Sequence, residues 1–121
     1  MAAPTILIIE DDPGNRDVLC AVLRGEGYKC VAVGNGDAAL AKIARRVPDL
    51  IVLDYRIPGI GGPALAEELR RRGARPPILL VTAAGDAEEL AREMGAAGWL
   101  SKPFELEDLL AEVARLCGSR A

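Results

Sequence analysis

The sequence has no histidine and few aromatic residues, with one tryptophan, one phenylalanine and two tyrosines among 121 residues. Without histidine, the chain cannot use an imidazole side chain as a base, a nucleophile or a phosphoryl carrier. Zinc sites built on histidine are excluded as well. Any histidine chemistry in the function of this protein therefore has to come from a partner.

Cysteine is scarce and charge is evenly spread. The chain has an odd number of cysteines, Cys20, Cys30 and Cys117, and they lack the spacing of metal-binding cysteines. This favours free buried thiols in a reducing compartment. The 15 basic and 18 acidic residues are mixed along the chain and give a formal net charge of −3. Since neither sign forms a block, we expect no nucleic-acid or anionic-membrane surface, and the arginine-rich segment 69–75 is interpreted as an exposed helix end.

Long hydrophobic runs and targeting signals are also missing. The longest apolar stretches have the length of strands, and the N-terminal segment lacks the basic residues and the cleavage site of a secretory signal. These observations predict a cytoplasmic protein that does not enter the membrane. The length fits one domain over residues 1–121 with its own hydrophobic core.

Five short apolar runs alternate with segments of helical periodicity. The runs are continuously apolar, which predicts strands buried on both faces. The first predicted helix begins at Pro13, carries an apolar stripe, and stops at two glycines. The apolar stripe of the first helix consists of Val18, Leu19, Val22 and Leu23, and the helix stops at Gly25 and Gly27. The predicted strands are residues 5–10, 28–33, 49–54, 77–82 and 98–101. The later predicted helices are residues 37–46, 63–72, 86–94 and 105–117.

The order of these segments predicts the fold class. Short connections and right-handed crossovers give an open parallel sheet with helices on both faces, which is a doubly wound three-layer α/β sandwich. In such folds, binding sites form at the carboxyl ends of the strands.

Polar residues stand where the predicted strands end. Glu10 and Asp11 end the first strand, Asp54 ends the third, Thr82 ends the fourth, and Lys102 follows the fifth. Three carboxylates and one ammonium group give this edge a formal charge of −2, which a divalent cation would neutralise. Oxygen ligands without sulfur or nitrogen favour Mg²⁺, which usually keeps waters and shares its shell with a phosphate. The sequence therefore predicts a site for Mg²⁺ and a phosphoryl group.

Asp12 is interpreted differently from its two acidic neighbours. It stands directly before Pro13, which suits the first position of a helix, so Asp12 is predicted to cap that helix and not to bind the cation. Separate roles for Glu10, Asp11 and Asp12 explain how three adjacent carboxylates are tolerated despite their repulsion.

Four sequence motifs occur in order at the strand ends, namely EDD at 10–12, LDYRIPGIGG at 53–62, VTAA at 81–84 and SKP at 101–103. Together they resemble the receiver domain of two-component response regulators, and the resemblance covers essentially the whole chain. It implies a flavodoxin-like, CheY-like fold with five parallel strands in the order 2-1-3-4-5. It also implies phosphorelay signalling through a 4-aspartylphosphate.

The resemblance further implies which residues form the metal and acceptor site. Asp54 would be the phosphoacceptor, receiving the phosphoryl group from a histidine kinase, a histidine phosphotransfer protein or a small phosphodonor. Asp11 and Asp54 would bind Mg²⁺, Glu10 would act through a water molecule, and Arg56 would add its main-chain carbonyl oxygen.

By the same resemblance, Lys102 would pair with the phosphoryl oxygens, while the Thr82 hydroxyl and the Ala83 amide would hydrogen-bond them. Thr82 would then move toward the phosphate and Trp99 would turn inward, which changes the surface of the fourth helix, fifth strand and fifth helix. That surface would contact a downstream target, an output domain or a second copy in a homodimer. Pro103 matches a cis-proline position that would aim Lys102 into the site.

Two positions depart from the usual pattern and bear on the lifetime of the phosphoryl group. Arg56 lies two residues after Asp54, and Ala84 lies two residues after Thr82. In the family these positions modulate the access of the hydrolytic water. We hypothesise that Arg56 reaches over the phosphoryl group while Ala84 leaves space.

Other functions are compatible with parts of the pattern. A receiver-like scaffold would bind partners without phosphorylation. An aspartyl-nucleophile phosphohydrolase would share Asp54, Thr82 and Lys102, but it usually needs a second acid where this chain has Arg56. A flavin mononucleotide carrier would need a glycine- and hydroxyl-rich phosphate loop in place of EDDPGN. We expect no enzyme activity beyond self-catalysed phosphoryl transfer and autodephosphorylation.

Overall fold

Strands and helices alternate along the chain in the computed structural model, which describes residues 3–83 and 85–117. Each of the predicted segments is present, with bounds that differ from the prediction by one residue in most cases. The strands are β1 (Thr5–Ile9), β2 (Lys29–Val33), β3 (Leu50–Asp54), β4 (Ile78–Thr82) and β5 (Gly98–Ser101). The helices are α1 (Pro13–Gly25), α2 (Gly36–Arg45), α3 (Gly62–Arg71), α4 (Ala87–Met94) and α5 (Leu106–Cys117).

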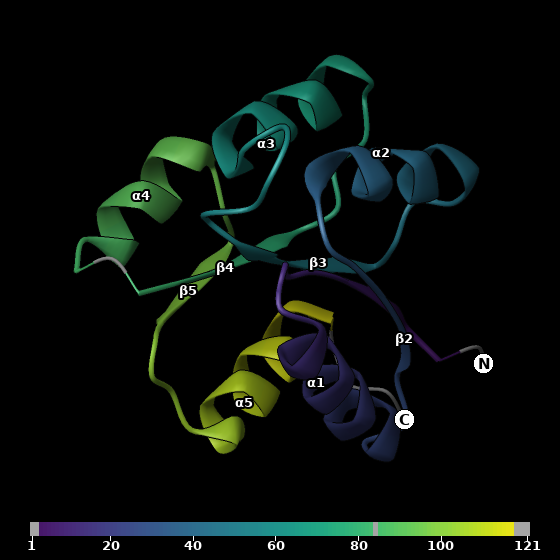
Figure 1. Cartoon of the computed structure of the whole chain (residues 1–121), viewed down its shortest axis with the longest axis vertical. Helices are drawn as coiled ribbons and strands as arrows, with labels where there is room; N and C mark the ends of the chain where they lie inside the picture. The colour runs from purple at the N-terminus through teal and green to yellow at the C-terminus, as the bar shows by residue number, and fades with distance from the viewer. Residues whose placement is uncertain (1–2, 84, 118–121) are drawn as a thin grey trace.

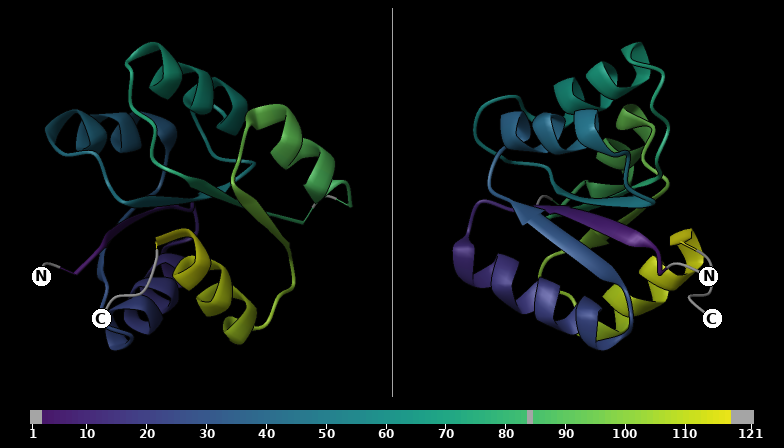
Figure 2. Two further views of the ribbon diagram at one scale, coloured as in Figure 1. Left: turned by 180° about the vertical axis from the view of Figure 1, so that it is seen from behind. Right: turned by 90° about the vertical axis from the view of Figure 1, so that its right-hand side faces the viewer.

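The five strands form one parallel sheet in the order β2-β1-β3-β4-β5. Helices α1 and α5 cover one face of the sheet, and α2, α3 and α4 cover the other, as Figure 1 and the rotated views of Figure 2 show. The fold class and the strand order predicted from the sequence are therefore confirmed.

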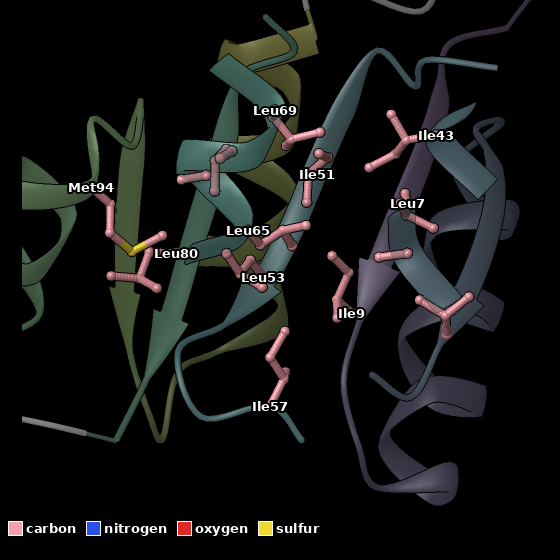
Figure 3. Close-up of a cluster of buried hydrophobic side chains, with 14 of the residues drawn as sticks. Leu7, Ile9, Ile43, Ile51, Leu53, Ile57, Leu65, Leu69, Leu80 and Met94 are labelled. Carbon is pink, nitrogen blue, oxygen red and sulfur yellow. The ribbon is translucent and has the colours of Figure 1, made fainter. Parts of the chain in front are cut away.

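The core consists of two layers of apolar side chains, one on each face of the sheet. In β1, Leu7 and Ile9 belong to the layer under α2, α3 and α4 (Figure 3), whereas Ile6 and Ile8 belong to the layer under α1 and α5. All four are at most 3% exposed. Because successive strand residues point to opposite faces and both faces are covered, the strands are continuously apolar. Each such side chain stabilises the fold by about 1.5–3 kcal/mol relative to its exposed state.

The predicted apolar stripe of α1 is only partly correct. Leu23 is fully buried, and Leu19 and Val22 are half-buried, but Val18 is 54% exposed. Val18 lies in the first half of the helix, where it lines a surface cavity together with residues from the strand ends and from the start of α5. Its apolar character therefore belongs to the surface beside the strand ends and not to the core.

The three cysteines are free thiols, as predicted. Cys20 and Cys30 are buried and lie on α1 and β2, with their Sγ atoms 2.9 Å apart. Burial raises the pKa of the Cys30 thiol far above its ordinary value. Cys117 is half-buried and not fully buried as expected, because it lies at the end of α5, and burial still raises the pKa of its thiol to about 11.

Two further predictions concern the ends of the chain and its location. The sequence predicts that the C-terminal segment CGSRA, residues 117–121, frays, and residues 118–121 of it lie outside the described residues. No helix in the described part of the chain is long and apolar enough to cross a membrane. The cytoplasmic location stays a prediction.

Candidate functional site

The polar residues predicted to meet do so at one edge of the sheet. Glu10 and Asp11 follow β1, Asp54 is the last residue of β3, Thr82 is the last residue of β4, and Lys102 follows β5. The parallel register aligns the strand ends, since Asp54 pairs with Val81 in β4. The site is therefore assembled by the topology from segments up to 92 residues apart.

Three carboxylates converge at this edge. Glu10, Asp11 and Asp54 each present one oxygen, and these three atoms lie within 4.8 Å of one another. Glu10 is 5% exposed, Asp54 is half-buried, and Asp11 is exposed. Two carboxylates this close repel by up to about 4 kcal/mol near a protein surface. The cluster therefore requires positive charge.

Lys102 supplies part of that charge. Its Nζ donates to Asp54 Oδ2 at 2.9 Å and to Glu10 Oε1 at 3.2 Å. Burial disfavours the ammonium form, but the hydrogen bonds and charges of Asp54 and Glu10 outweigh it, so the pKa of Lys102 lies above its ordinary value. One ammonium for three carboxylates leaves a formal charge of −2, which suits a divalent cation.

Asp12 caps α1, as predicted. Its Oδ1 accepts from the main-chain amides of Gly14 at 2.8 Å and Asn15 at 3.3 Å. Its own amide donates to Glu10 Oε2 at 3.0 Å, while the other oxygen of Glu10 accepts from Lys102. The Asp12 carboxylate is thereby occupied by the helix, and it does not belong to the cluster that converges at the sheet edge.

Arg16 is a site residue that sequence reasoning missed. Its guanidinium Nη1 donates to the carbonyl oxygens of Glu10 at 2.9 Å and Asp11 at 3.1 Å. The only available signal is that Arg16 stands four residues after Asp12, one helical turn into α1, so that its side chain can reach back over the acidic loop. That signal is weak, because an arginine in a first turn usually faces solvent.

A cavity of about 260 Å³ lies beside the carboxylates. It is lined by Asp54, Arg56, Thr82, Ala83 and Lys102, which are five of the residues predicted to form the site. Thr82 is 1% exposed, and its carbonyl oxygen accepts from the Lys102 amide at 2.8 Å. The Arg56 amide donates to Asp54 Oδ1 at 3.1 Å. The cavity therefore brings the Lys102 ammonium group, Thr82 and the main chain of Arg56 beside the Asp54 carboxylate.

A larger cavity of about 510 Å³ shares Asp54, Ala83 and Lys102 with the first. Its wall is mainly apolar and comes from the strand ends and from the starts of α1 and α5, where Val18 is 54% exposed and Leu106 is 44% exposed. The carboxylates are thus accessible from a surface that a bulky molecule could cover.

Three remaining predictions have different outcomes. The Lys102–Pro103 peptide is cis, as the resemblance implied. Trp99 lies on β5 and is 43% exposed, so its indole is not packed inside in this state. Ala84 lies outside the described residues, and the hypothesis that it leaves space beside the phosphoryl group stays a prediction.

Comparison with known proteins agrees with this geometry. The sequence model of the response regulator receiver domain matches residues 6–114. The chain belongs to the response regulator receiver family. This receiver is 39% identical over 114 residues to the DNA-binding response regulator MtrA of Mycolicibacterium smegmatis, a match that covers 92% of this chain and 50% of MtrA. The chain spans about half or less of the curated relatives it matches.

Solved structures of receivers superimpose on the whole fold. The receiver domain of the sensor histidine kinase PA1611 of Pseudomonas aeruginosa, which has a magnesium ion coordinated in its active site cleft, is 34% identical with a TM-score of 0.85, covering 98% of this chain and 100% of that one. The BeF3-activated receiver domain of RstA from Klebsiella pneumoniae is 32% identical with a TM-score of 0.85, covering 95% and 99%.

The donor set of this receiver fits Mg²⁺. Glu10, Asp11 and Asp54 offer carboxylate oxygens only, and hard oxygen ligands are what Mg²⁺ prefers. The carbonyl of Arg56, which follows Asp54 by two residues, is a further oxygen on the same segment. The three carboxylates therefore form a donor set that suits Mg²⁺.

Proposed function

We propose that this receiver accepts a phosphoryl group on Asp54 from the phosphohistidine of a histidine kinase or a histidine phosphotransfer protein. The observation that supports this proposal is the convergence of the Glu10, Asp11 and Asp54 oxygens within 4.8 Å of one another, beside the ammonium of Lys102. Since the chain has no histidine, the donor group is supplied by the partner.

In the proposed step, a carboxylate oxygen of Asp54 attacks the phosphorus atom of the donor. A P–O bond to Asp54 forms, the N–P bond of the phosphohistidine breaks, and the imidazole leaves with its electron pair and takes up a proton. The product is an acyl phosphate, so the carboxylate acts as a nucleophile. Mg²⁺ held by Asp11, Asp54, Glu10 and the Arg56 carbonyl would neutralise charge on the transferring group.

The residues around the 260 Å³ cavity act on the phosphoryl group after transfer. Lys102 exchanges a carboxylate oxygen for a phosphoryl oxygen, while the Thr82 hydroxyl and the Ala83 amide donate hydrogen bonds to the others. Thr82 moves toward the phosphate, and Trp99 turns into the space behind it. The surface of α4, β5 and α5 thereby changes and selects a downstream protein, an output domain or a second receiver.

The apolar wall of the 510 Å³ cavity supports a protein donor. The exposed Val18 and Leu106 side chains flank the route to Asp54, so a partner that covers them would bring its phosphohistidine to the carboxylates and exclude water. Small donors such as acetyl phosphate would reach Asp54 without that surface.

The proposal is tested by incubating the protein with Mg²⁺ and acetyl phosphate and weighing it. We expect a mass gain of about 80 Da, equal to one phosphoryl group. No gain should occur when a chelator is added before the phosphodonor. Asp54→Asn should show no gain. Asp12→Asn is the matched control, because it removes a neighbouring carboxylate that caps α1, and it should gain the same mass as the parent.

Two outcomes would contradict the proposal. If the parent gains no mass although it binds Mg²⁺, the protein is a receiver-like scaffold. If the parent and Asp54→Asn gain mass equally, the phosphoryl group resides on another residue. Steady release of phosphate from unrelated phosphomonoesters would instead indicate a phosphohydrolase.

A further inference from the structure

Arg16 contacts the main chain on both sides of Asp11. The carbonyl oxygen of Glu10 belongs to the peptide group that precedes the Asp11 Cα atom, and the carbonyl oxygen of Asp11 belongs to the peptide group that follows it. Both accept from the same nitrogen, Arg16 Nη1, at 2.9 and 3.1 Å. One guanidinium group therefore fixes both peptide planes that flank the exposed carboxylate of the cluster.

These two carbonyls lie where regular structure provides no partner. The sheet pattern ends with the Glu10 amide, which donates to Val33 O at 3.0 Å, and α1 begins with the Arg16 amide, which donates to Asp12 O at 3.0 Å. The carbonyls of Glu10 and Asp11 lie between the last main-chain hydrogen bond of the sheet and the first one of α1. Because the dihedral angles at a Cα atom set the direction of its side chain, holding both planes also aims the Asp11 carboxylate.

Gly34 provides the space that the guanidinium occupies. A Cβ atom at this position would lie 2.7 Å from Arg16 Nη1 and 3.9 Å from the carbonyl oxygen of Glu10. The φ angle of Gly34 is not in the left-handed region, so its backbone conformation is open to other residues. The requirement at Gly34 is therefore for room beside Arg16.

Ion pairing does not account for the position of Arg16. Four acidic residues, Glu10, Asp11, Asp12 and Asp17, surround it in the sequence, yet within the described residues no carboxylate oxygen lies within 4.0 Å of its guanidinium nitrogens. The side chain is half-buried and directs Nη1 to neutral carbonyl oxygens. Arg16 therefore does not compete with a cation for the carboxylate oxygens of the cluster.

We propose that Arg16 is a positioning residue of the metal site, which orients Asp11 through the two peptide groups that flank it, and that Gly34 leaves the gap this requires. The inference rests on the proposed function only in taking Mg²⁺ as the ion. It assigns a role to a residue that touches neither the ion nor the phosphoryl group.

The first test measures Mg²⁺ affinity by calorimetry without any phosphodonor. Loss of residues that orient metal ligands typically weakens metal binding by about 10- to 100-fold. We expect Arg16→Ala to weaken Mg²⁺ binding by about tenfold or more. Arg24→Ala is the matched control, because Arg24 lies on the same helix and also donates to a main-chain carbonyl, that of Cys30 at 2.8 Å, but far from the site. Its Mg²⁺ affinity should stay within about twofold of the parent.

The second test uses Gly34→Ala alone and combined with Arg16→Ala. With Arg16 present, the added Cβ displaces the guanidinium, and Mg²⁺ binding should weaken toward the level of Arg16→Ala. Without Arg16 the added Cβ meets no guanidinium, so the same substitution should have no further effect on affinity. Additive losses of affinity would instead show that Gly34→Ala acts independently of Arg16, and would refute the role of Gly34. Arg16→Lys, which keeps the charge on a different donor group, should give an intermediate affinity.

The outcomes separate this inference from the proposed function. If the parent binds Mg²⁺ and is phosphorylated but Arg16→Ala and Gly34→Ala bind the ion as tightly as Arg24→Ala, the role of Arg16 is refuted and the proposed function stands. If the parent itself neither binds Mg²⁺ nor gains mass, both are refuted. Should Arg16→Ala fail to fold, Gly34→Ala is compared in the parent and in an Arg16→Lys background. A smaller loss of Mg²⁺ affinity with Lys at position 16 supports the role of Arg16, and an equal loss refutes it.

Discussion

The ammonium group of Lys102 bridges Asp54 and Glu10, at 2.9 Å from Oδ2 of the first and 3.2 Å from Oε1 of the second. A cation that binds the same oxygens therefore competes with Lys102 for them. Lys102→Met removes one positive charge and frees both oxygens, so we expect Mg²⁺ to bind about three- to tenfold more tightly. This ratio corresponds to a change in binding free energy of roughly 0.6–1.4 kcal/mol. Calorimetric titration measures this change.

The control for Lys102 is Lys42→Met, because Lys42 lies near the end of α2 and is exposed. Its Mg²⁺ affinity should equal that of the parent. Weaker Mg²⁺ binding in Lys102→Met than in Lys42→Met would show that Lys102 orients the carboxylates more than it competes for them.

Asp11 and Asp12 are adjacent but should differ completely in their effect on the metal. Asp11→Asn removes a member of the carboxylate cluster, and Mg²⁺-dependent phosphorylation should be lost at millimolar Mg²⁺. Asp12→Asn leaves the cluster intact, so the phosphorylated fraction should match the parent. Mass measurement after incubation with acetyl phosphate distinguishes them, and the reverse result would assign the metal ligand to Asp12.

Asp12 should instead affect stability. Asp12→Ala removes the oxygen that accepts from the Gly14 and Asn15 amides, and the free energy of unfolding should fall by about 1 kcal/mol. Asp12→Asn keeps an oxygen in the same place and should cost only a few tenths of this, about 0.3 kcal/mol or less. Urea denaturation measures both values. Equal losses in the two variants would mean that the negative charge of Asp12, and not its capping hydrogen bonds, stabilises α1.

Trp99 reports on the proposed switch, because it is the single tryptophan of the chain and is 43% exposed before phosphorylation. If it turns inward behind Thr82, acrylamide should quench its fluorescence less after treatment with acetyl phosphate and Mg²⁺ than before. Asp54→Asn provides the control and should show the same quenching under both conditions. Unchanged quenching in a parent that has gained the phosphoryl mass would exclude Trp99 from the switch.

Most of the fold could be predicted because its signals are local. A run such as Leu50 to Leu53 is apolar on both faces, and a charged residue that ends it, Asp54, marks the carboxyl edge of the sheet. The parallel topology then brings the strand ends together without further information. For the same reason, Asp12 could be identified as a cap, since its partners lie two and three residues away.

The features that could not be predicted depend on contacts between distant segments or on the end of an element. Val18 has helical spacing to Val22, but only the structure shows that it lines an open cavity and is 54% exposed. One carboxylate oxygen of Glu10 accepts from Lys102, 92 residues away. Gly34 looks like an ordinary turn residue, and its role becomes visible only with the Arg16 side chain in place.

Glu68 on α3 provides a prediction for acid conditions that does not involve the site. Its carboxylate accepts from Arg71 Nε at 3.0 Å and from Arg72 Nε at 2.7 Å. These hydrogen bonds lower the pKa of Glu68 to about 2, and the bond from Arg71 contributes most. A carboxyl group whose pKa is lower in the folded state stabilises the fold above its ordinary pKa of 4.5, and this stabilisation is lost as the pH falls through about 2.

Glu68→Gln should therefore be less stable than the parent at neutral pH, with a difference that shrinks as the pH falls from 4.5 toward about 2. The difference should also decrease in high salt, because ion pairs at the surface are screened. Urea denaturation at a series of pH values measures it. Glu93→Gln is the control, since Glu93 is an exposed residue of α4 that makes no ion pair among the residues the structure describes. A constant difference between the parent and Glu68→Gln across this range would show that the two arginines do not hold the carboxylate in solution.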